Sequence, residues 1–355
     1  MRILLLTRYE RLGSSSRVRF YQYIPYLQEH GVEVTNSPFF TDEYVKRLYT
    51  GQAVSKTEIL QAYLKRFFVL ASSTAYDLVW IEKELFPWFP AWFESLLSLF
   101  KVPYVVDYDD AVYHRYDLHP SPLIRRLLGR KIDRVMHHAA LVIVGNDYLA
   151  ERAKQAGARK VEVLPSVVDV QSYKTKPAAV GLSFRIGWIG SPVTAPYLDG
   201  VGEALAKLSQ EMDIHITLIG SGEFDPFKNI PTTRHSWSEG LERSIGEMFD
   251  IGIMPLIDGP FERGKCGYKL IQYMAAGLPV IASPIGVNKQ IVRPGENGYL
   301  AASTAEWLDA FRKLGNNAEL RLKMGQSGRQ QAEQLYNLSV TAPRLLDRLS
   351  SVRRV

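Results

Sequence analysis

The segment of this sequence with the clearest binding chemistry is a glycine-rich loop over residues 259–267, directly before a predicted helix. A helix N-terminus presents unpaired backbone N–H groups and partial positive charge, and glycine lets the backbone approach an anion closely. Arg263 and Lys265 add full positive charges to this loop. An isolated GKxG pattern is more often a solvated basic turn, but here a strand precedes the loop, and the helix returns to a strand through Gly277 and Pro279. The arrangement predicts a phosphate-binding site.

Carboxylates gather at the end of the strand predicted over residues 104–107. Asp107 closes this strand, and Asp109 and Asp110 follow it. Ligands of parallel sheets bind at the carboxyl ends of the strands, so these side chains are candidates for substrate contact. Clustered carboxylates beside a phosphate are unfavourable unless they bind hydroxyl groups or a metal ion. A DxD-like metal site is one interpretation of the pattern in isolation.

The loop after the first predicted strand, Arg11–Arg17, is a second candidate binding segment. Its sequence is RLGSSSR, in which Gly13 and the serines can donate hydrogen bonds to a diphosphate or to an acceptor. A plain serine N-cap is the alternative, and Ser16 could serve both purposes.

Two glutamates, Glu82 and Glu84, end the predicted strand of DLVWIEKE and point to the same kind of edge. They are either ligands of an acceptor or members of a strand-end charge pair with Lys83.

Alternating strand-length and helix-period segments must position these groups. Apolar runs of strand length occur at residues 3–7, 32–35, 78–82, 104–107, 141–144, 161–164, 184–188, 214–219, 251–255 and 280–282. Helical periodicity fits at about 17–30, 57–70, 88–99, 121–138, 147–156, 196–210, 240–248, 268–276, 304–314, 317–336 and 339–352. Because helices follow the strands throughout, the sequence predicts parallel sheets with helices on both faces.

The alternation breaks at the polar segment Gln171–Gly181, which has a proline, two lysines and no periodicity. We interpret it as a linker between domains, and a prior of roughly 150 residues per domain also indicates two domains. We expect a Rossmann-like acceptor-binding domain over residues 1–171 and a Rossmann-like donor domain over 172–338. A helix over 339–355 can pack back on the first domain. The expected fold class is α/β, with two doubly wound domains facing a cleft.

The composition is that of an ordinary globular protein and argues against several classes. Hydrophobic residues make up 46% and charged residues 23% of the 355 residues. The one cysteine, Cys266, excludes an internal disulfide and fits a reducing cytoplasm. No stretch reaches the roughly 18 apolar residues of a membrane span, and MRILLL is expected to be a core strand rather than a secretory signal. The net charge of +6 favours anionic partners, but no nucleic-acid-binding pattern accompanies it.

The stretch YMAAGLPVIASPIGVNKQIVRPGENGYL, residues 273–300, resembles the donor-site signature of family 4 glycosyltransferases, retaining enzymes of the GT-B fold. Residues 1–19, 163–169, 184–198 and 218–224 are similar to other parts of that family in the same order. The long block is specific, whereas each short segment is weak by itself. The resemblance covers nearly the whole chain. It implies a nucleotide-diphosphate sugar as co-substrate, an acceptor hydroxyl, and no metal or other cofactor.

The sequence departs from the family at positions that matter for the donor. Two glutamates that the family usually carries seven positions apart are replaced by Lys265 and Gln272. Gln272 can still hydrogen-bond a ribose diol, whereas Lys265 reverses the charge near the donor sugar. The family also tends to place an arginine and a lysine after the first strand of the second domain, and residues 190–198 have neither. Our hypothesis is that Arg263 and Lys265 supply this countercharge from the other loop.

Residue chemistry and resemblance together define the expected site. The expected catalytic residues lie in two of these segments and are Asp109, Asp110 and Lys265. The expected acceptor contacts are Arg17, Glu82 and Glu84. The expected donor contacts are Gly13, Ser14, Gly190, Ser191, Gly220, Arg263, Gly264, Lys265, Cys266, Gly267, Tyr268, Lys269 and Gln272.

Two stretches indicate contact with a bilayer. Residues 85–100 are strongly aromatic, and residues 125–134 form a basic helix face. This combination suits an enzyme that docks on a membrane to reach a lipid-linked acceptor. Core packing and solvated charge are the alternatives. The expected location is the cytoplasm, with peripheral contact at the inner face of the membrane.

The sequence thus predicts a retaining glycosyltransferase that acts on a glycan or lipid-linked acceptor in cell-surface glycan or glycolipid synthesis. The leaving phosphate itself can take the acceptor proton, so the missing glutamates do not exclude catalysis. They do keep one alternative open, a catalytically silent homologue that binds sugar nucleotides as an assembly or regulatory subunit. The residue patterns of an epimerase or a phosphorylase are not apparent.

Overall fold

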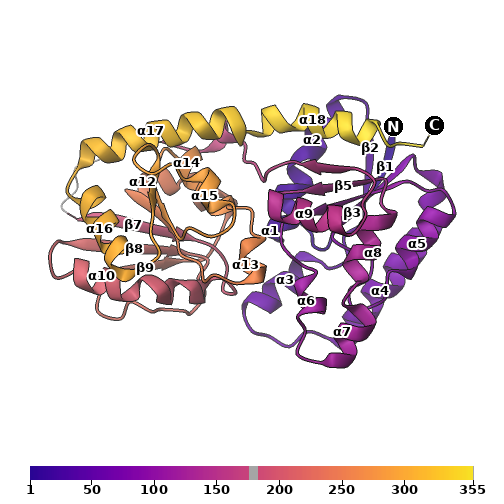
Figure 1. Cartoon of the computed structure of the whole chain (residues 1–355), viewed down its shortest axis with the longest axis horizontal. Helices are drawn as coiled ribbons and strands as arrows, with labels where there is room; N and C mark the ends of the chain where they lie inside the picture. The colour runs from indigo at the N-terminus through magenta and orange to yellow at the C-terminus, as the bar shows by residue number, and fades with distance from the viewer. Residues whose placement is uncertain (176–182, 355) are drawn as a thin grey trace. The chain divides into compact units, whose positions relative to one another are not determined.

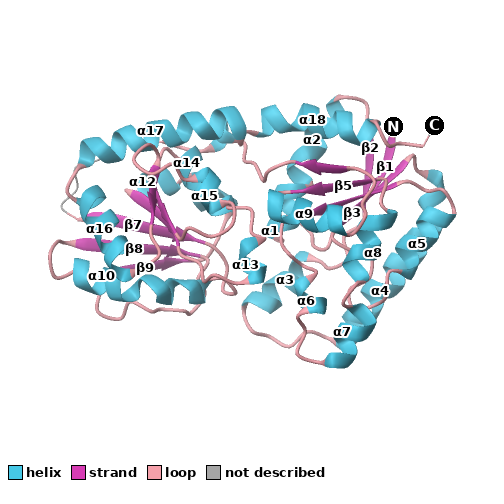
Figure 2. Ribbon diagram, viewed as in Figure 1, coloured by secondary structure: helices cyan, strands magenta, loops and turns pink. Residues whose placement is uncertain are grey.

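The structure is a computed structural model that describes residues 1–175 and 183–354, and it contains two α/β units (Figure 1). The first unit consists of Met1–Ser166, Arg263–Cys266 and Thr341–Val355, and the second of Val167–Glu262 and Gly267–Val340. Each unit has a six-stranded sheet in which neighbouring strands are parallel. Helices cover both sheets (Figure 2). The predicted class of two doubly wound α/β domains is confirmed.

The sheet of the first unit has the order β2-β1-β3-β4-β5-β6. Its strands are β1 (Arg2–Leu6), β2 (Glu33–Asn36), β3 (Leu78–Glu82), β4 (Tyr104–Tyr108), β5 (Leu141–Val144) and β6 (Val161–Val163). Its helices are α1 (Ser14–Arg19), α2 (Ile24–Glu29), α3 (Asp42–Tyr49), α4 (Lys56–Ala71), α5 (Trp92–Leu99), α6 (His114–Asp117), α7 (Pro122–Leu128), α8 (Lys131–His138) and α9 (Asp147–Gln155). The central strands are buried on both faces, as their continuous apolar runs require.

The sheet of the second unit has the order β12-β11-β10-β7-β8-β9. Its strands are β7 (Phe184–Ile189), β8 (Ile214–Ile219), β9 (Thr232–His235), β10 (Ile251–Met254), β11 (Val280–Ala282) and β12 (Gly298–Leu300). Its helices are α10 (Gly202–Leu208), α11 (Glu239–Arg243), α12 (Ile245–Met248), α13 (Pro260–Arg263), α14 (Tyr268–Ala275), α15 (Asn288–Ile291), α16 (Thr304–Gly315) and α17 (Ala318–Leu335). The last helix, α18 (Leu338–Ser350), has most of its residues in the first unit.

Some predicted elements differ from the observed ones in ways with a physical cause. The helix expected near residues 121–138 is two helices, α7 and α8, separated at Gly129 and Arg130. The helix expected near residues 17–30 is divided into α1 and α2, with a proline in the first turn of α2. The predicted linker Gln171–Gly181 falls largely on residues outside those that the structure describes. In the described ranges, no helix has the length and apolar character needed to cross a bilayer.

Candidate active site

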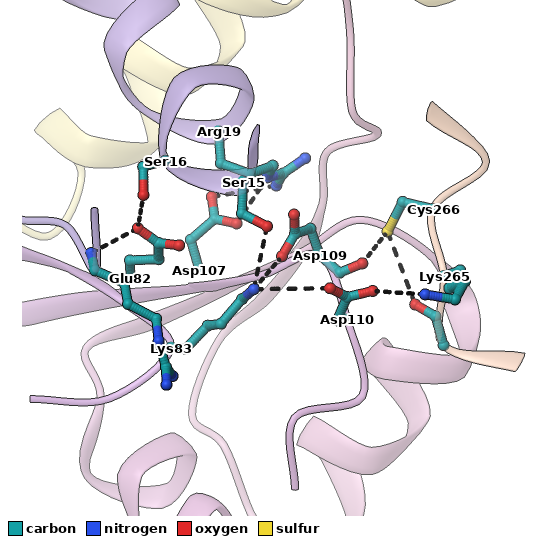
Figure 3. A network of polar contacts seen from close by, with 12 residues as sticks. Ser15, Ser16, Arg19, Glu82, Lys83, Asp107, Asp109, Asp110, Lys265 and Cys266 are labelled. Carbon is teal, nitrogen blue, oxygen red and sulfur yellow. Dashed lines mark hydrogen bonds and ion pairs between the residues drawn. The ribbon is translucent and has the colours of Figure 1, made fainter. Parts of the chain in front are cut away.

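The candidate residues of the first unit gather at the topological switch point of its sheet, where the strand order reverses. From β1 the chain crosses to β2 on one side, whereas β3 lies on the other side of β1. Ligands of doubly wound sheets bind outside the carboxyl ends of the strands at such a switch point. The helix α1, the ends of β3 and β4 and the residues that follow these two strands contribute polar side chains to one network there (Figure 3).

Glu82, at the end of β3, ties the loop after β1 to the sheet. Its Oε2 accepts hydrogen bonds from the Ser16 hydroxyl at 2.6 Å and from the Arg8 backbone N–H at 2.7 Å. The Ser16 Oγ in turn accepts from the backbone N–H of Tyr9 at 3.1 Å. Glu82 is only 2% exposed. Its contacts therefore fix the shape of the loop. Because the side chain is buried, the structure does not support the expected contact of Glu82 with an acceptor.

Glu84 is likewise turned toward the interior. Its carboxylate pairs with the Lys131 ammonium and accepts a hydrogen bond from the Tyr116 hydroxyl at 2.8 Å. The Arg8 guanidinium lies 3.6 Å away. The hydrogen bonds and ion pairs of this buried carboxylate are all made within the protein. The contacts of Glu84 therefore support the fold and not the expected contact with an acceptor. Arg17 is also largely buried, on α1.

Lys83 forms its ion pairs with two aspartates that follow β4, and not with the glutamates beside it, a pairing that was one of the two alternatives for Glu82 and Glu84. Its ammonium lies 2.9 Å from Oδ1 of Asp109 and 3.8 Å from Oδ2 of Asp110, and it donates to the Ser15 hydroxyl at 3.2 Å (Figure 3). The Lys83 backbone has a φ of 64°, a left-handed conformation that is rare for a residue with a side chain. Sequence reasoning did not assign Lys83 to the site.

The Lys83 cation and the two aspartates shift one another's pKa values. Burial opposes ionisation of Asp109, but Lys83, Ser15 and Arg19 outweigh burial and hold the pKa of Asp109 below its usual value. Burial and the negative charge of Asp109 raise the pKa of Asp110. Burial would lower the pKa of Lys83, yet the surrounding carboxylates raise it. Asp110 is the more accessible of the two, with its side chain 28% exposed against 14% for Asp109.

Asp107, the first of the three aspartates, has a different partner. Arg19 of α1 holds it through two hydrogen bonds, Nε to Oδ1 at 2.8 Å and Nη2 to Oδ2 at 3.1 Å, and also donates to the Leu164 carbonyl. Burial raises the pKa of Asp107 to about 6 although the Arg19 guanidinium favours the ionised form. This bidentate pair joins α1 to the end of β4, which positions the serines of α1 beside Lys83.

The segment Arg263–Cys266 groups with the first unit, although it lies between α13 and α14 in the sequence. The Lys265 ammonium is 4.0 Å from Oδ1 of Asp110, and the Cys266 thiol donates to the Asp109 carbonyl at 3.0 Å (Figure 3). A Cβ at Gly264 would lie 2.5 Å from the Cβ of Ala111. Gly264 is therefore required for this close packing, a different use of the glycine from the expected approach to a phosphate.

The rate at which the Cys266 thiol is alkylated reports directly on that packing, because Cys266 is the only cysteine of the chain. It is 7% exposed, and burial together with the charge of Asp109 raises the pKa of its thiol. Thiolates react with iodoacetamide and thiols do not, so we expect alkylation of the native protein at about pH 8 to be at least about a hundredfold slower than in urea. Mass spectrometry over time measures this, and equal rates in both conditions would contradict the burial.

In the second unit, the turn after β7 occupies the corresponding switch point, since β8 and β10 flank β7. A Cβ at Gly190 would lie 2.4 Å from the Trp188 ring and 2.9 Å from Cε of Lys269, and a Cβ at Gly220 would lie 2.3 Å from the Gly190 carbonyl oxygen. Both positions therefore need glycine. The Ser191 backbone N–H donates to Oγ1 of Thr194 at 3.2 Å, which closes the turn.

The Lys269 ammonium reaches this turn from the helix α14. It lies 3.4 Å from Oγ1 of Thr194 and 5.3 Å from the centre of the Trp188 ring. α14 begins after Gly267, whose φ is 66°, and a Cβ there would collide with Ile291 at 2.3 Å. The second unit thus combines a cation, a glycine turn and a helix N-terminus, the combination that binds phosphate groups.

A buried carboxylate that sequence reasoning missed organises the other side of α14. Glu242 accepts hydrogen bonds from the hydroxyls of Tyr173 at 2.8 Å and Tyr268 at 3.1 Å, and from Nε1 of Trp237 at 2.9 Å. Tyr173 also contacts the amide of Gln272, which is 3% exposed. No sequence signal marks Glu242, because two of its three donors, Tyr173 and Tyr268, are distant in the sequence.

Comparisons with known proteins bear on the family and the fold of this chain. A family model described as glycosyl transferases group 1 matches residues 183–317. N-acetyl-alpha-D-glucosaminyl L-malate synthase of Bacillus anthracis is 26% identical over 137 residues, 37% of this chain and 35% of that protein. Phosphatidyl-myo-inositol mannosyltransferase of Mycobacterium leprae is 27% identical over 218 residues, 54% of this chain and 53% of that protein. The chain thus spans between about a third and a half of the length of these relatives.

Among solved structures, Anabaena Alr3699/HepE in complex with UDP and glucose superposes with a TM-score of 0.70. It covers 99% of this chain and 100% of its own at 18% identity, a likeness that concerns the fold. Residues 183–317 thus match the model of the group 1 glycosyltransferases, and the two Rossmann-like units have the architecture of the GT-B fold.

Proposed function

We propose that this protein transfers a sugar from a nucleotide-diphosphate sugar to an acceptor hydroxyl with retention of the anomeric configuration. The observation that carries the proposal is the Lys269 ammonium beside the glycine turn at the end of β7. Negative charge develops on the diphosphate as the glycosidic bond breaks. In this proposal, Lys269 and the N-terminus of α14 stabilise that charge within the second unit.

Lys269 takes over, in this proposal, the countercharge expected of Arg263 and Lys265. The Lys265 ammonium lies near Asp110 of the first unit, so part of its charge is already compensated. Lys269, in contrast, belongs to α14, whose N-terminus is part of the proposed phosphate site. Gln272 is proposed to be near the ribose, held by Tyr173.

Asp110 is the proposed hydrogen-bond acceptor for the hydroxyl of the sugar acceptor. It is the more accessible of the two aspartates that Lys83 binds, and a carboxylate fixed by a buried cation is oriented before the substrate arrives. The leaving diphosphate takes the proton of that hydroxyl. The name of one relative, a phosphatidyl-myo-inositol mannosyltransferase, supports an acceptor in glycan or glycolipid synthesis.

A nucleotide screen followed by turnover tests this function. We expect one of UDP, GDP, ADP or TDP and its sugars to raise the melting temperature, since a ligand of the native state stabilises it. Sugar transfer with that donor should yield a product whose anomeric coupling in NMR spectra matches the donor. Stabilisation without any release of sugar, with or without acceptors, would instead fit a silent homologue.

The Asp110→Asn variant sharpens the same test. It should keep the thermal response to the nucleotide and lose transfer by about a hundredfold or more. Asp309→Asn is the matched control, because Asp309 is an exposed aspartate of α16 paired with Lys313, and it should transfer sugar at the normal rate. Transfer by Asp110→Asn at the normal rate would remove Asp110 from the proposed mechanism.

A further inference from the structure

Two helices of the first unit expose the same apolar pattern. The exposed apolar side chains of α4 are Leu60, Leu64, Phe67 and Phe68. Those of α5 and the residue after it are Trp92, Leu96, Leu99 and Phe100. All eight are between 42% and 73% exposed. Each set has the spacing i, i+4, i+7, i+8, which places its members on one face of a helix.

The two stripes point away from the same side of the sheet. The inward residues of both helices, Ala62 of α4 and Leu97 of α5, belong to one core cluster, and α4 and α5 lie on the same side of the unit (Figure 1). The Phe67 ring contacts the ring of Phe93 on α5, with their centres 6.1 Å apart. The outward stripes are therefore neighbours and form one surface.

The loop before α5 extends this surface with two more aromatic residues. Trp88 and Phe89 are 51% and 45% exposed. The Phe89 ring lies 5.5 Å from that of Tyr63 on α4, and the Trp88 ring lies 5.7 Å from that of His119, just before α7. We call the two stripes with Trp88 and Phe89 the apolar face. Monomeric proteins rarely leave a contiguous apolar patch of more than a few hundred Å² without a partner.

The charges around the apolar face are positive. Lys65 of α4, Lys101 after α5, and Arg125 and Arg126 of α7 are exposed. The acidic residue of α4, Glu58, is paired with Arg47 at 2.9 Å. Glu94, the acidic residue of α5, is buried and accepts the Leu85 backbone N–H, and α7 has no acidic residue. An apolar surface rimmed by cations is complementary to an anionic bilayer.

We propose that the apolar face docks the first unit on an anionic lipid bilayer. Its tryptophans, phenylalanines and leucines enter the headgroup boundary, and the basic side chains of α4 and α7 lie among lipid phosphates. Tryptophan is especially suited to that boundary. This docking surface specifies how the protein would reach a membrane-borne acceptor. That the acceptor is membrane-borne rests on the proposed function.

Vesicle flotation tests the docking without any donor or acceptor. The wild-type chain should float with vesicles of phosphatidylcholine and phosphatidylglycerol, bind phosphatidylcholine vesicles more weakly, and lose affinity as salt is raised. The double variant Phe68→Ser/Leu99→Ser should lose at least about tenfold in partitioning, because it removes apolar area from both stripes. Arg125→Glu/Arg126→Glu should weaken binding to the anionic vesicles and not to the neutral ones.

Leu322→Ser/Leu335→Ser is the matched control, since both leucines are exposed on α17 of the second unit, and it should float like the wild type. Unchanged melting curves would show that the variants fold. The proposal is overturned if the wild-type chain does not float, or if it forms a dimer in solution that Phe68→Ser/Leu99→Ser dissociates. A chain that transfers sugar to a soluble acceptor but ignores vesicles would refute the docking alone.

Discussion

Replacing Lys269 by alanine is expected to raise the dissociation constant of the nucleoside diphosphate about 10- to 100-fold. A hydrogen bond to a charged group contributes about 1.5–3 kcal/mol, and each 1.4 kcal/mol or so is tenfold in affinity. The Lys269 ammonium lies 3.4 Å from the hydroxyl of Thr194 in the glycine turn and 5.3 Å from the centre of the Trp188 ring. Titration calorimetry with the nucleotide found in the thermal screen gives the constant.

Two further variants separate this role from general effects. Lys269→Arg keeps the charge and should lose much less affinity than Lys269→Ala. Lys207→Ala removes an exposed lysine of α10 that pairs with Glu203, and the dissociation constant should not change. If Lys269→Ala binds the diphosphate as tightly as the wild type, the anion site of the second unit lies elsewhere and the proposed mechanism loses its countercharge.

The central strands could be predicted because burial on both faces demands apolar runs. β3 and β4 are buried along their full length, and the sequence shows them directly. The missed strands, β9 and β12, are the two edges of the second sheet. An edge strand has one neighbour and needs fewer apolar residues. The polar TTRH of β9 and the three residues of β12 accordingly carry no strand signal.

The candidate site could be predicted only where the chemistry is local. The aspartates after β4 and the glycine loop before α14 each stand out within a few residues. The partner of Asp109 does not, because Lys83 reaches it through the register of two strands, in which Glu82 stands opposite Asp107. Since the sequence does not show this register, it offered the neighbouring glutamates, Glu82 and Glu84, as partners of Lys83. Two of the three donors to Glu242, Tyr173 and Tyr268, are distant in the sequence, so only the folded chain reveals this cluster.

Replacing Lys83 by methionine is expected to lower the free energy of unfolding of the first unit by about 3–5 kcal/mol, the usual cost of leaving a buried charge without its partner. Methionine keeps the length of the side chain but leaves Asp109 and Asp110 as two neighbouring carboxylates without their shared cation. Urea denaturation at about pH 7 measures the loss. Lys101→Met is the matched control, because Lys101 is exposed and its φ of 54° gives it the same left-handed backbone; it should unfold like the wild type.

The pH dependence of that loss identifies its cause. In the wild type the pKa of Asp109 is lowered, so its contribution is present above the pKa of an unfolded aspartate, about 3.9, and is lost as the pH falls. Without Lys83, burial and mutual repulsion raise the pKa of both aspartates, so ionisation now destabilises the folded state as the pH rises. The difference between Lys83→Met and wild type should therefore be largest near pH 7 and shrink toward about pH 4. A difference that does not change with pH would mean that lost packing, rather than unpaired charge, destabilises the variant.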